Sequence, residues 1–258
     1  MTRRLAAWLL AAIAFVAVPA GNAAAQRPPT IAAAADLNAA LPDIVDAFTK
    51  ETGDRVEVVF GSSGVLTRQI RDGAPFDMFL SADENFVFQL ADAGVTRDRG
   101  MLYAIGHIVL FAPPGSPLVP SEGLEGLGRL LKAGRVTRFA IANPEVAPYG
   151  RAAEAALRAS GLWDAIEPRL VRGDNVSQAA QFATTGNAVG GIIAGSLASA
   201  PNMRDRGTYA VIPDTLHPPL RQRMVLLTRA GPVAERFYTF MQGATARGIL
   251  ERFGFGMP

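Results

Sequence analysis

Small polar side chains stand at several points where a strand-like apolar run gives way to a helix-like run. Ser62 and Ser63 follow the strand-like segment 55–60 in the stretch FGSSGVLTRQI. The first N–H groups of a helix have no partner within the helix and carry a partial positive charge, so such a turn can bind an anion. Three further turns have the same character: AAAADLN at 32–38, NPEVAPYGRAA at 143–153 and GDNVSQAA at 173–180. Together the four turns are suited to an anion site built from neutral donors.

The same turns also have an ordinary structural explanation. Serine, aspartate and asparagine cap helices throughout α/β proteins, so each turn taken alone is typical of a scaffold. The turns at 32–38, 60–66 and 143–153 contain no arginine or lysine before Arg68 and Arg151, which lie past the first helical positions. Four such turns, two in each half of the chain, favour only a general hypothesis: an exported two-lobe α/β protein that binds something small.

Catalytic chemistry has less support. Ser62 or Ser63 could act as a nucleophile with His107 or His217 as its base, but GSSG is not the Gly-x-Ser-x-Gly elbow of hydrolases. The two histidines lack metal-ligand spacing, and the absence of cysteine excludes disulfides and thiolate chemistry. We expect no enzyme activity, no metal ion and no cofactor, and keep a secreted serine hydrolase as the alternative from another class.

The N-terminal residues carry an export pattern. Arg3 and Arg4 precede the apolar run LAAWLLAAIAFVAV, and three small residues at 23–25 fit a cleavage site. The apolar run is shorter than the ~20 residues that cross a bilayer, and Pro19 follows it. We therefore expect a signal peptide over 1–25 and a periplasmic mature chain. Without the two signal arginines the basic and acidic residues are equal at 23 each, and no basic run favours nucleic acid.

The elements that must position these turns alternate along the chain. Strand and helix patterns follow each other three times between residues 30 and 94, which predicts a mostly parallel sheet with helices on both faces. A second series begins near HIVLFAPPG at 107–115, and the segment 233–255 is predicted to form one long amphipathic helix. We expect an α/β protein of two Rossmann-like lobes joined by a hinge, with its ligand in the cleft between them. The expected lobes are 26–106 with 215–258, and 107–214.

Three motifs, in this order, resemble those of the periplasmic molybdate-binding proteins of ABC transporters. They are GSSGVLTRQI, GAPFDMFLSAD and the Pro-Tyr-Gly turn at 148–150. The resemblance covers nearly the whole mature chain. It implies a type II periplasmic binding protein, a monomer, whose lobes close over molybdate or tungstate and deliver it to an inner-membrane ABC permease. The molybdenum would be bound only as the oxyanion, by N–H groups and hydroxyls at helix starts.

Carried over by position, the resemblance implies five ligand residues: Asp36, Ser63, Tyr149, Val176 and Ala194. Ser63 would offer its hydroxyl and N–H group, and Val176 its N–H group. Many members have a serine at position 36. A carboxylate there would face a dianion, so we expect Asp36 to bind through its N–H group and to cap its own helix with its side chain.

The remaining two positions also depart from the common pattern. Ala194 stands where many members place a tyrosine that donates its phenol, so one donor is lost. Tyr149 stands where those members have a small residue, and its hydroxyl could enter the cleft from the facing turn, or its ring could only pack over the cleft. Because of Asp36 and Ala194, another oxyanion or a small organic acid remains an alternative ligand.

Overall fold

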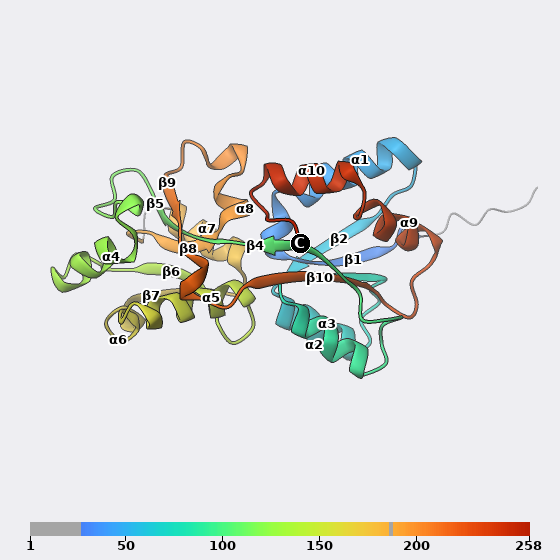
Figure 1. Cartoon of the computed structure of the whole chain (residues 1–258), viewed down its shortest axis with the longest axis horizontal. Coiled ribbons are helices and arrows are strands. Elements are labelled where there is room, and N and C mark those ends of the chain that lie inside the picture. The colour runs from blue at the N-terminus through green and yellow to red at the C-terminus, as the bar shows by residue number, and fades with distance from the viewer. Residues whose placement is uncertain (1–26, 186–187) are drawn as a thin grey trace, which may run out of the picture.

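Two five-stranded sheets form two lobes in the computed structural model, which describes residues 27–185 and 188–258 (Figure 1). The predicted signal peptide over 1–25 lies outside the described residues. Within the described ranges, no helix is long and apolar enough to cross a membrane. The predicted α/β class with two lobes is confirmed.

The sheet of the first lobe has the strand order β2-β1-β3-β10-β4. β1 runs parallel to β2 and β3, as the alternating pattern predicts, whereas β10 runs antiparallel between β3 and β4 and makes the sheet mixed. Sequence patterns did not predict β4. The bounds are Thr30–Ala34 for β1, Glu57–Gly61 for β2, Met78–Ser81 for β3, Met101–Gly106 for β4 and Leu220–Leu226 for β10.

Helices cover both faces of this sheet, with α1 beside α10 on one side and α2 beside α3 on the other (Figure 1). Phe48 of α1 packs edge-on against Phe237 and Phe240 of α9, with ring centroids 5.1 and 5.4 Å apart. The bounds are Ala35–Asn38 for the 3-10 helix η1, Leu41–Thr52 for α1, Ser63–Arg71 for α2, Glu84–Asp92 for α3, Pro232–Phe240 for α9 and Ala244–Arg252 for α10.

The prediction of one long helix over 233–255 is wrong. α9 ends at Phe240, and α10 begins only at Ala244. Gly243 lies between them in an extended conformation, and its residue type disfavours a helix interior. The break divides the segment into two short helices.

The sheet of the second lobe has the order β7-β6-β8-β5-β9, with β6 parallel to β7 and β8, and β5 antiparallel to β8 and β9. Its strands are β5 (Ile108–Ala112), β6 (Phe139–Ala142), β7 (Leu170–Gly173), β8 (Gly191–Ala194) and β9 (Thr208–Val211). Its α-helices are α4 (Gly123–Lys132), α5 (Pro148–Ala159), α6 (Trp163–Ile166), α7 (Val176–Thr184) and α8 (Gly195–Ala198). Its 3-10 helices are η2 (Pro120–Glu122), η3 (Glu167–Arg169), η4 (Pro201–Met203) and η5 (Asp214–Leu216).

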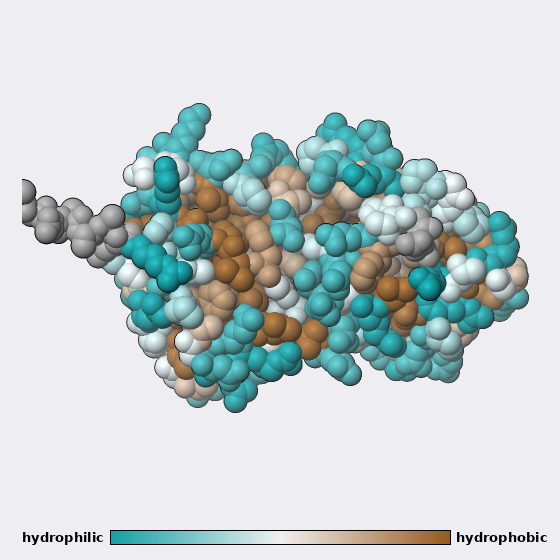
Figure 2. All heavy atoms as spheres, turned by 180° about the vertical axis from the view of Figure 1, so that it is seen from behind, coloured by the Kyte–Doolittle hydropathy of each residue, from teal (hydrophilic) through white to brown (hydrophobic). Residues whose placement is uncertain are grey.

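The chain passes between the lobes from β4 to β5 and returns from β9 to β10 (Figure 1). Ala34, Ala35 and Ala82 of the first lobe belong to the same buried cluster as the core of the second. Seen from behind, polar residues form most of the outer rim of both lobes, while apolar residues gather toward the middle of the face (Figure 2). The lobes are therefore in direct contact, and what lies between them is largely closed to solvent.

Candidate binding site between the lobes

A small cavity lies where the two lobes meet. The cavity lies at the carboxyl ends of the parallel strands β1, β2, β6 and β7. Each of these strands leads into one of the turns that line the cavity. Ligands of α/β proteins commonly bind at this edge. Four of the five residues expected to bind the ligand line the cavity: Asp36, Ser63, Tyr149 and Val176.

Ala194, the fifth expected residue, lies outside the lining. It ends β8, pairs with Ile108 in the sheet and is fully buried as the residue before α8. Two residues further on, the Ser196 hydroxyl donates to the carbonyl oxygen of Asp36 at 2.8 Å. This stretch of the second lobe therefore supports the backbone that carries Asp36.

The start of α2 brings two buried serine hydroxyls to the cavity. Ser62 is the residue that precedes the helix, and its Oγ atom has no hydrogen-bond partner in the described part of the protein. Ser63 Oγ accepts a hydrogen bond of 3.0 Å from the N–H group of Ala82. A serine oxygen that accepts a bond still has its own proton to donate. Both hydroxyls can thus serve as donors, and sequence reasoning assigned only Ser63 to the ligand.

The Asp36 carboxyl group lies in η1 and is fully buried. Its Oδ2 atom accepts hydrogen bonds from the Tyr149 hydroxyl at 3.0 Å and from Gln222 Nε2 at 2.6 Å, whereas Oδ1 has no partner among the described residues. Burial raises the pKa of Asp36 to about 6, although the bonds from Gln222 and Tyr149 oppose the rise. The expectation that this side chain caps its own helix is wrong, because its partners come from α5 and β10.

Gln222 and Tyr103 complete this hydrogen-bond network, and sequence reasoning missed both. The Tyr103 hydroxyl donates to Gln222 Oε1 at 2.7 Å, and Gln222 Nε2 also lies 3.1 Å from the Tyr149 hydroxyl oxygen. Burial raises the pKa of both tyrosines well above the usual value, so both remain protonated donors. The available signal was an uncharged polar side chain, Gln222, within a strand whose alternate residues are buried.

Close backbone contacts join the lobes around the cavity. The Gly64 N–H group in α2 donates to the Val146 carbonyl oxygen at 3.0 Å, and a Cβ atom on Gly64 would lie 2.7 Å from that oxygen. On the opposite side, the Ser177 hydroxyl of α7 donates to the Ala35 carbonyl oxygen at 2.8 Å. Gly64, the second glycine of the GSSG turn, is therefore required, because any side chain at this position would collide with the second lobe.

Charged side chains occupy the rim and leave the cavity itself without a cation. Arg151 of α5 pairs with Asp83, which caps α3, at 2.6 Å, and its guanidinium group lies over the Phe86 ring. The described residues that line the cavity include no arginine, lysine or histidine. A bound anion would therefore be held by neutral donors.

The arrangement does not support hydrolysis. His107 Nδ1 lies 3.4 Å from Asp214, and His217 Nδ1 lies 2.9 Å from the Pro218 carbonyl oxygen. Neither histidine makes a hydrogen bond with Ser62, whose hydroxyl oxygen is unpartnered among the described residues. The described ranges also contain no cluster of three side chains able to hold a metal ion.

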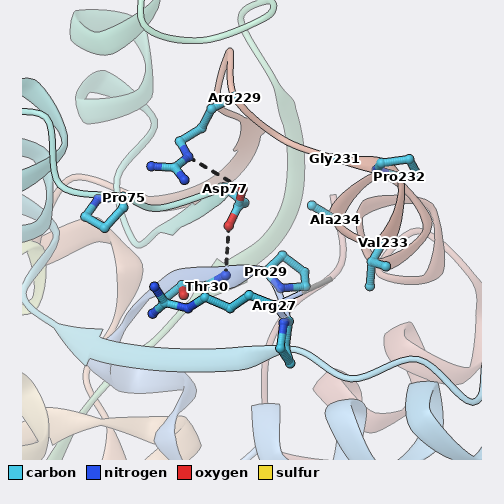
Figure 3. Close-up of a pocket in the computed structure, with 11 residues that line it drawn as sticks. Arg27, Pro29, Thr30, Pro75, Asp77, Arg229, Gly231, Pro232, Val233 and Ala234 are labelled. Carbon is cyan, nitrogen blue, oxygen red and sulfur yellow. Dashed lines mark hydrogen bonds and ion pairs between the residues drawn. The ribbon is translucent and has the colours of Figure 1, made fainter. Parts of the chain in front are cut away.

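A second pocket lies at the opposite end of the first sheet, where β1 and β3 begin (Figure 3). Asp77 lies in it and accepts a hydrogen bond of 2.9 Å from the Thr30 N–H group, while Arg229 approaches its other oxygen at 3.8 Å. Each arginine of this pocket pairs with a carboxylate, Arg229 with Asp77 and Arg27 with Glu57, and no turn from the second lobe reaches it. The cavity between the lobes is the better candidate.

Two α/β lobes that enclose a buried, donor-lined cavity define a ligand-binding protein. The model of the family described as bacterial extracellular solute-binding protein matches residues 29–256. The chain belongs to this family, and it is therefore a binding protein and not an enzyme.

Individual relatives resemble the chain over most of its length. The molybdate-binding protein of Azotobacter vinelandii is 35% identical over 88% of this chain and 89% of its own, and that of Rhodobacter capsulatus is 34% identical over 98% and 96%. The solved structure of the periplasmic molybdate-binding protein of Azotobacter vinelandii superposes with a TM-score of 0.81 at 29% identity, covering 89% of this chain and 99% of that one. The resemblance therefore extends to the arrangement of both lobes.

Proposed function

We propose that the chain captures molybdate in the cavity between its lobes and delivers it to an ABC permease in the inner membrane, from the periplasmic side. The observation that carries this proposal is the lining of the cavity. The starts of α2, α5 and α7, together with η1, converge on one small space that has hydroxyl donors and no cationic side chain. The molybdate-binding relatives from two organisms support the same ligand.

The proposed donors are the N–H groups and hydroxyls of the converging turns. Ser63 would contribute its hydroxyl and N–H group, Val176 the N–H group at the start of α7, and Asp36 its N–H group. Ser62 would add a second hydroxyl. Hydrogen bonds to a charged acceptor contribute roughly 1.5–3 kcal/mol each. Several such bonds would account for tight binding of a dianion without a counter-charge.

Ion size would determine selectivity. Tungstate has the same charge and tetrahedral shape as molybdate, so we propose that it binds as well. Sulfate is smaller, and donors fixed at the starts of packed helices cannot move inward to shorten every bond at once. The chain would therefore reject sulfate.

We further propose that the moving units are residues 26–106 with 215–258, and residues 107–214. The division is supported by the sheets, because β1 to β4 and β10 form one sheet and β5 to β9 form the other. Residues of a single chain line the cavity, so a monomer is sufficient for binding.

Isothermal titration of the purified mature protein with sodium molybdate, and then with sodium sulfate in the same buffer, tests the proposal. We expect submicromolar binding of molybdate, binding of tungstate and no heat from sulfate. Binding of a small organic acid in preference to all three oxyanions would assign the chain a different ligand.

A further inference from the structure

Among the described residues that line the cavity, Asp36 is the one that a dianion would tolerate poorly in its ionised form. It lines the cavity, it is fully buried, and its Oδ1 atom has no hydrogen-bond partner among the described residues. Its other oxygen, Oδ2, already accepts bonds from Tyr149 and Gln222. A buried polar atom without a partner is rare, so the position of Oδ1 needs an explanation.

The side chains around Asp36 offer no positive charge to balance it. The titratable groups that face it are the hydroxyls of Tyr149 from α5 and Tyr103 from β4, and both are neutral. Neither α7 nor α8, which pack against η1, contains a charged residue.

The charged side chains on the other elements near Asp36 are engaged elsewhere or stand at the far end of their element. On α5 Arg151 pairs with Asp83, and on β10 Arg221 and Arg223 pair with Glu84. α1 contributes Asp43, Asp46, Lys50 and Glu51, which are all exposed, and β2 contributes the exposed Glu57 at its opposite end. An ionised Asp36 and a dianion would therefore meet in a small space without a cation between them.

We propose that Asp36 binds the oxyanion as the neutral acid, donating its proton from Oδ1 to a ligand oxygen, so that each molybdate ion bound takes up one proton. This inference rests on the proposed function. The proton moves from water to the carboxyl group, and no covalent bond of the ligand changes. In this state Oδ2 keeps its two donors, and the unpartnered oxygen becomes one more donor to the ligand.

Linkage then fixes how the affinity depends on pH. In the free protein the carboxyl group has a pKa of about 6, and a neighbouring dianion raises the pKa further, because it disfavours a second negative charge. Between these two pKa values the protein must gain a proton in order to bind. The dissociation constant therefore rises about tenfold for each pH unit in this range.

The Asp36→Asn substitution distinguishes the proposed uptake of a proton by Asp36 from a purely structural role of this side chain. In the Asp36→Asn variant the amide oxygen can accept the bonds from Tyr149 and Gln222, and the amide nitrogen can donate to the ligand at every pH. Asp46→Asn is the matched control, because it makes the same chemical change on the exposed face of α1. We expect the Asp36→Asn variant to bind molybdate about fiftyfold to a hundredfold more tightly than the native protein at pH 8 and about equally at pH 5.

The test is calorimetric titration of the mature protein with sodium molybdate at pH 5, 7 and 8, in pairs of buffers that differ in ionisation enthalpy. The native protein and the Asp46→Asn variant should take up close to one proton per molybdate at pH 7, and the Asp36→Asn variant none. Molybdate binding without proton uptake, and with a dissociation constant independent of pH, would overturn this inference and leave the proposed function intact.

Two further outcomes differ from molybdate binding without proton uptake. Tighter binding of inorganic phosphate than of molybdate at pH 8, without proton uptake, would mean that an ionised Asp36 accepts a proton carried by the ligand, and it would overturn the inference. Absence of molybdate binding by the native protein and the Asp46→Asn control at every pH would overturn the proposed function and this inference together.

Discussion

The Tyr149 hydroxyl, on α5 of the second lobe, donates a hydrogen bond of 3.0 Å to the carboxyl group of Asp36, in η1 of the first. Gln222 donates to the same oxygen atom from β10 and is itself fixed by Tyr103 of β4. The network therefore connects both lobes and includes the antiparallel pair β10 and β4 at one side of the first sheet. Its geometry depends on the lobes being closed.

Removal of the Tyr149 hydroxyl should weaken closure. In Tyr149→Phe the bond between the lobes is lost, and Asp36 Oδ2 retains only Gln222 as a donor. Loss of one hydrogen bond to a buried carboxyl group costs about 1.5 kcal/mol, which corresponds to a roughly tenfold weaker affinity for molybdate. Titration calorimetry measures the effect, and Tyr209→Phe, at an exposed position of β9, is the control. Equal affinities of the two variants would mean that Tyr149 contributes only its ring.

The two serines of the GSSG turn should behave differently. Ser63→Ala leaves the buried Ala82 N–H group unpaired, so it should lower the free energy of unfolding by about 1–3 kcal/mol and weaken oxyanion binding at least about tenfold. Ser62 Oγ has no partner among the described residues, so Ser62→Ala should weaken binding without lowering the melting temperature. Thermal unfolding and calorimetry on both variants check this, and an unchanged affinity in Ser63→Ala would remove Ser63 from the proposed site.

The stability of the ligand-free protein should depend on pH through Asp36. Its pKa rises from 3.8 to about 6 on folding, so the folded state binds more protons than the unfolded state between these values. Stability from this group is complete below about pH 4 and is lost as the pH rises through about 6, by about 3 kcal/mol in total.

Urea unfolding of the native protein and the Asp36→Asn variant at pH 5 and 8 measures this contribution. The variant cannot ionise at position 36, so its advantage in unfolding free energy over the native protein should grow between the two pH values. A constant difference across this range would mean that the folded carboxyl group titrates normally.

A methyl group on Gly64 should hinder the approach of the lobes. The added Cβ atom would lie 2.7 Å from the Val146 carbonyl oxygen of the other lobe, too close for contact without a shift. Gly64→Ala should therefore weaken molybdate affinity at least about tenfold while each lobe remains folded. Small-angle scattering should show a smaller decrease in radius of gyration on addition of ligand.

Gly248→Ala provides the control for this substitution. Gly248 lies within α10, and its Cβ atom would meet nothing within 4 Å, so alanine there should leave affinity unchanged and raise stability by up to about 1 kcal/mol. If Gly64→Ala bound molybdate as tightly as this control, the contact between Gly64 and Val146 would have no part in closure.

Local patterns predicted the lobes and the turns because both depend on residues close together in the chain. The apolar strands and the helix starts at Ser63 and Val176 are visible in short windows of sequence. The partners of Asp36 are not, because Gln222 lies 186 positions away and Tyr149 lies 113 positions away. A carboxylate beside a helix start favours capping on local grounds, and only the tertiary structure brings two stronger donors to it.

The strand order of the first sheet also sets the sequence in which the chain can finish folding. β10 lies between β3 and β4, although the whole of the second lobe separates it from them along the chain. The second lobe is formed by one continuous stretch of the chain, from β5 to β9, so all of its strand pairings lie within that stretch. The lobe that begins at the N-terminus cannot complete its sheet until the last quarter of the chain supplies the strand between β3 and β4. Gln222 arrives with that strand, so the support for Asp36 is assembled only when nearly the whole polypeptide is present.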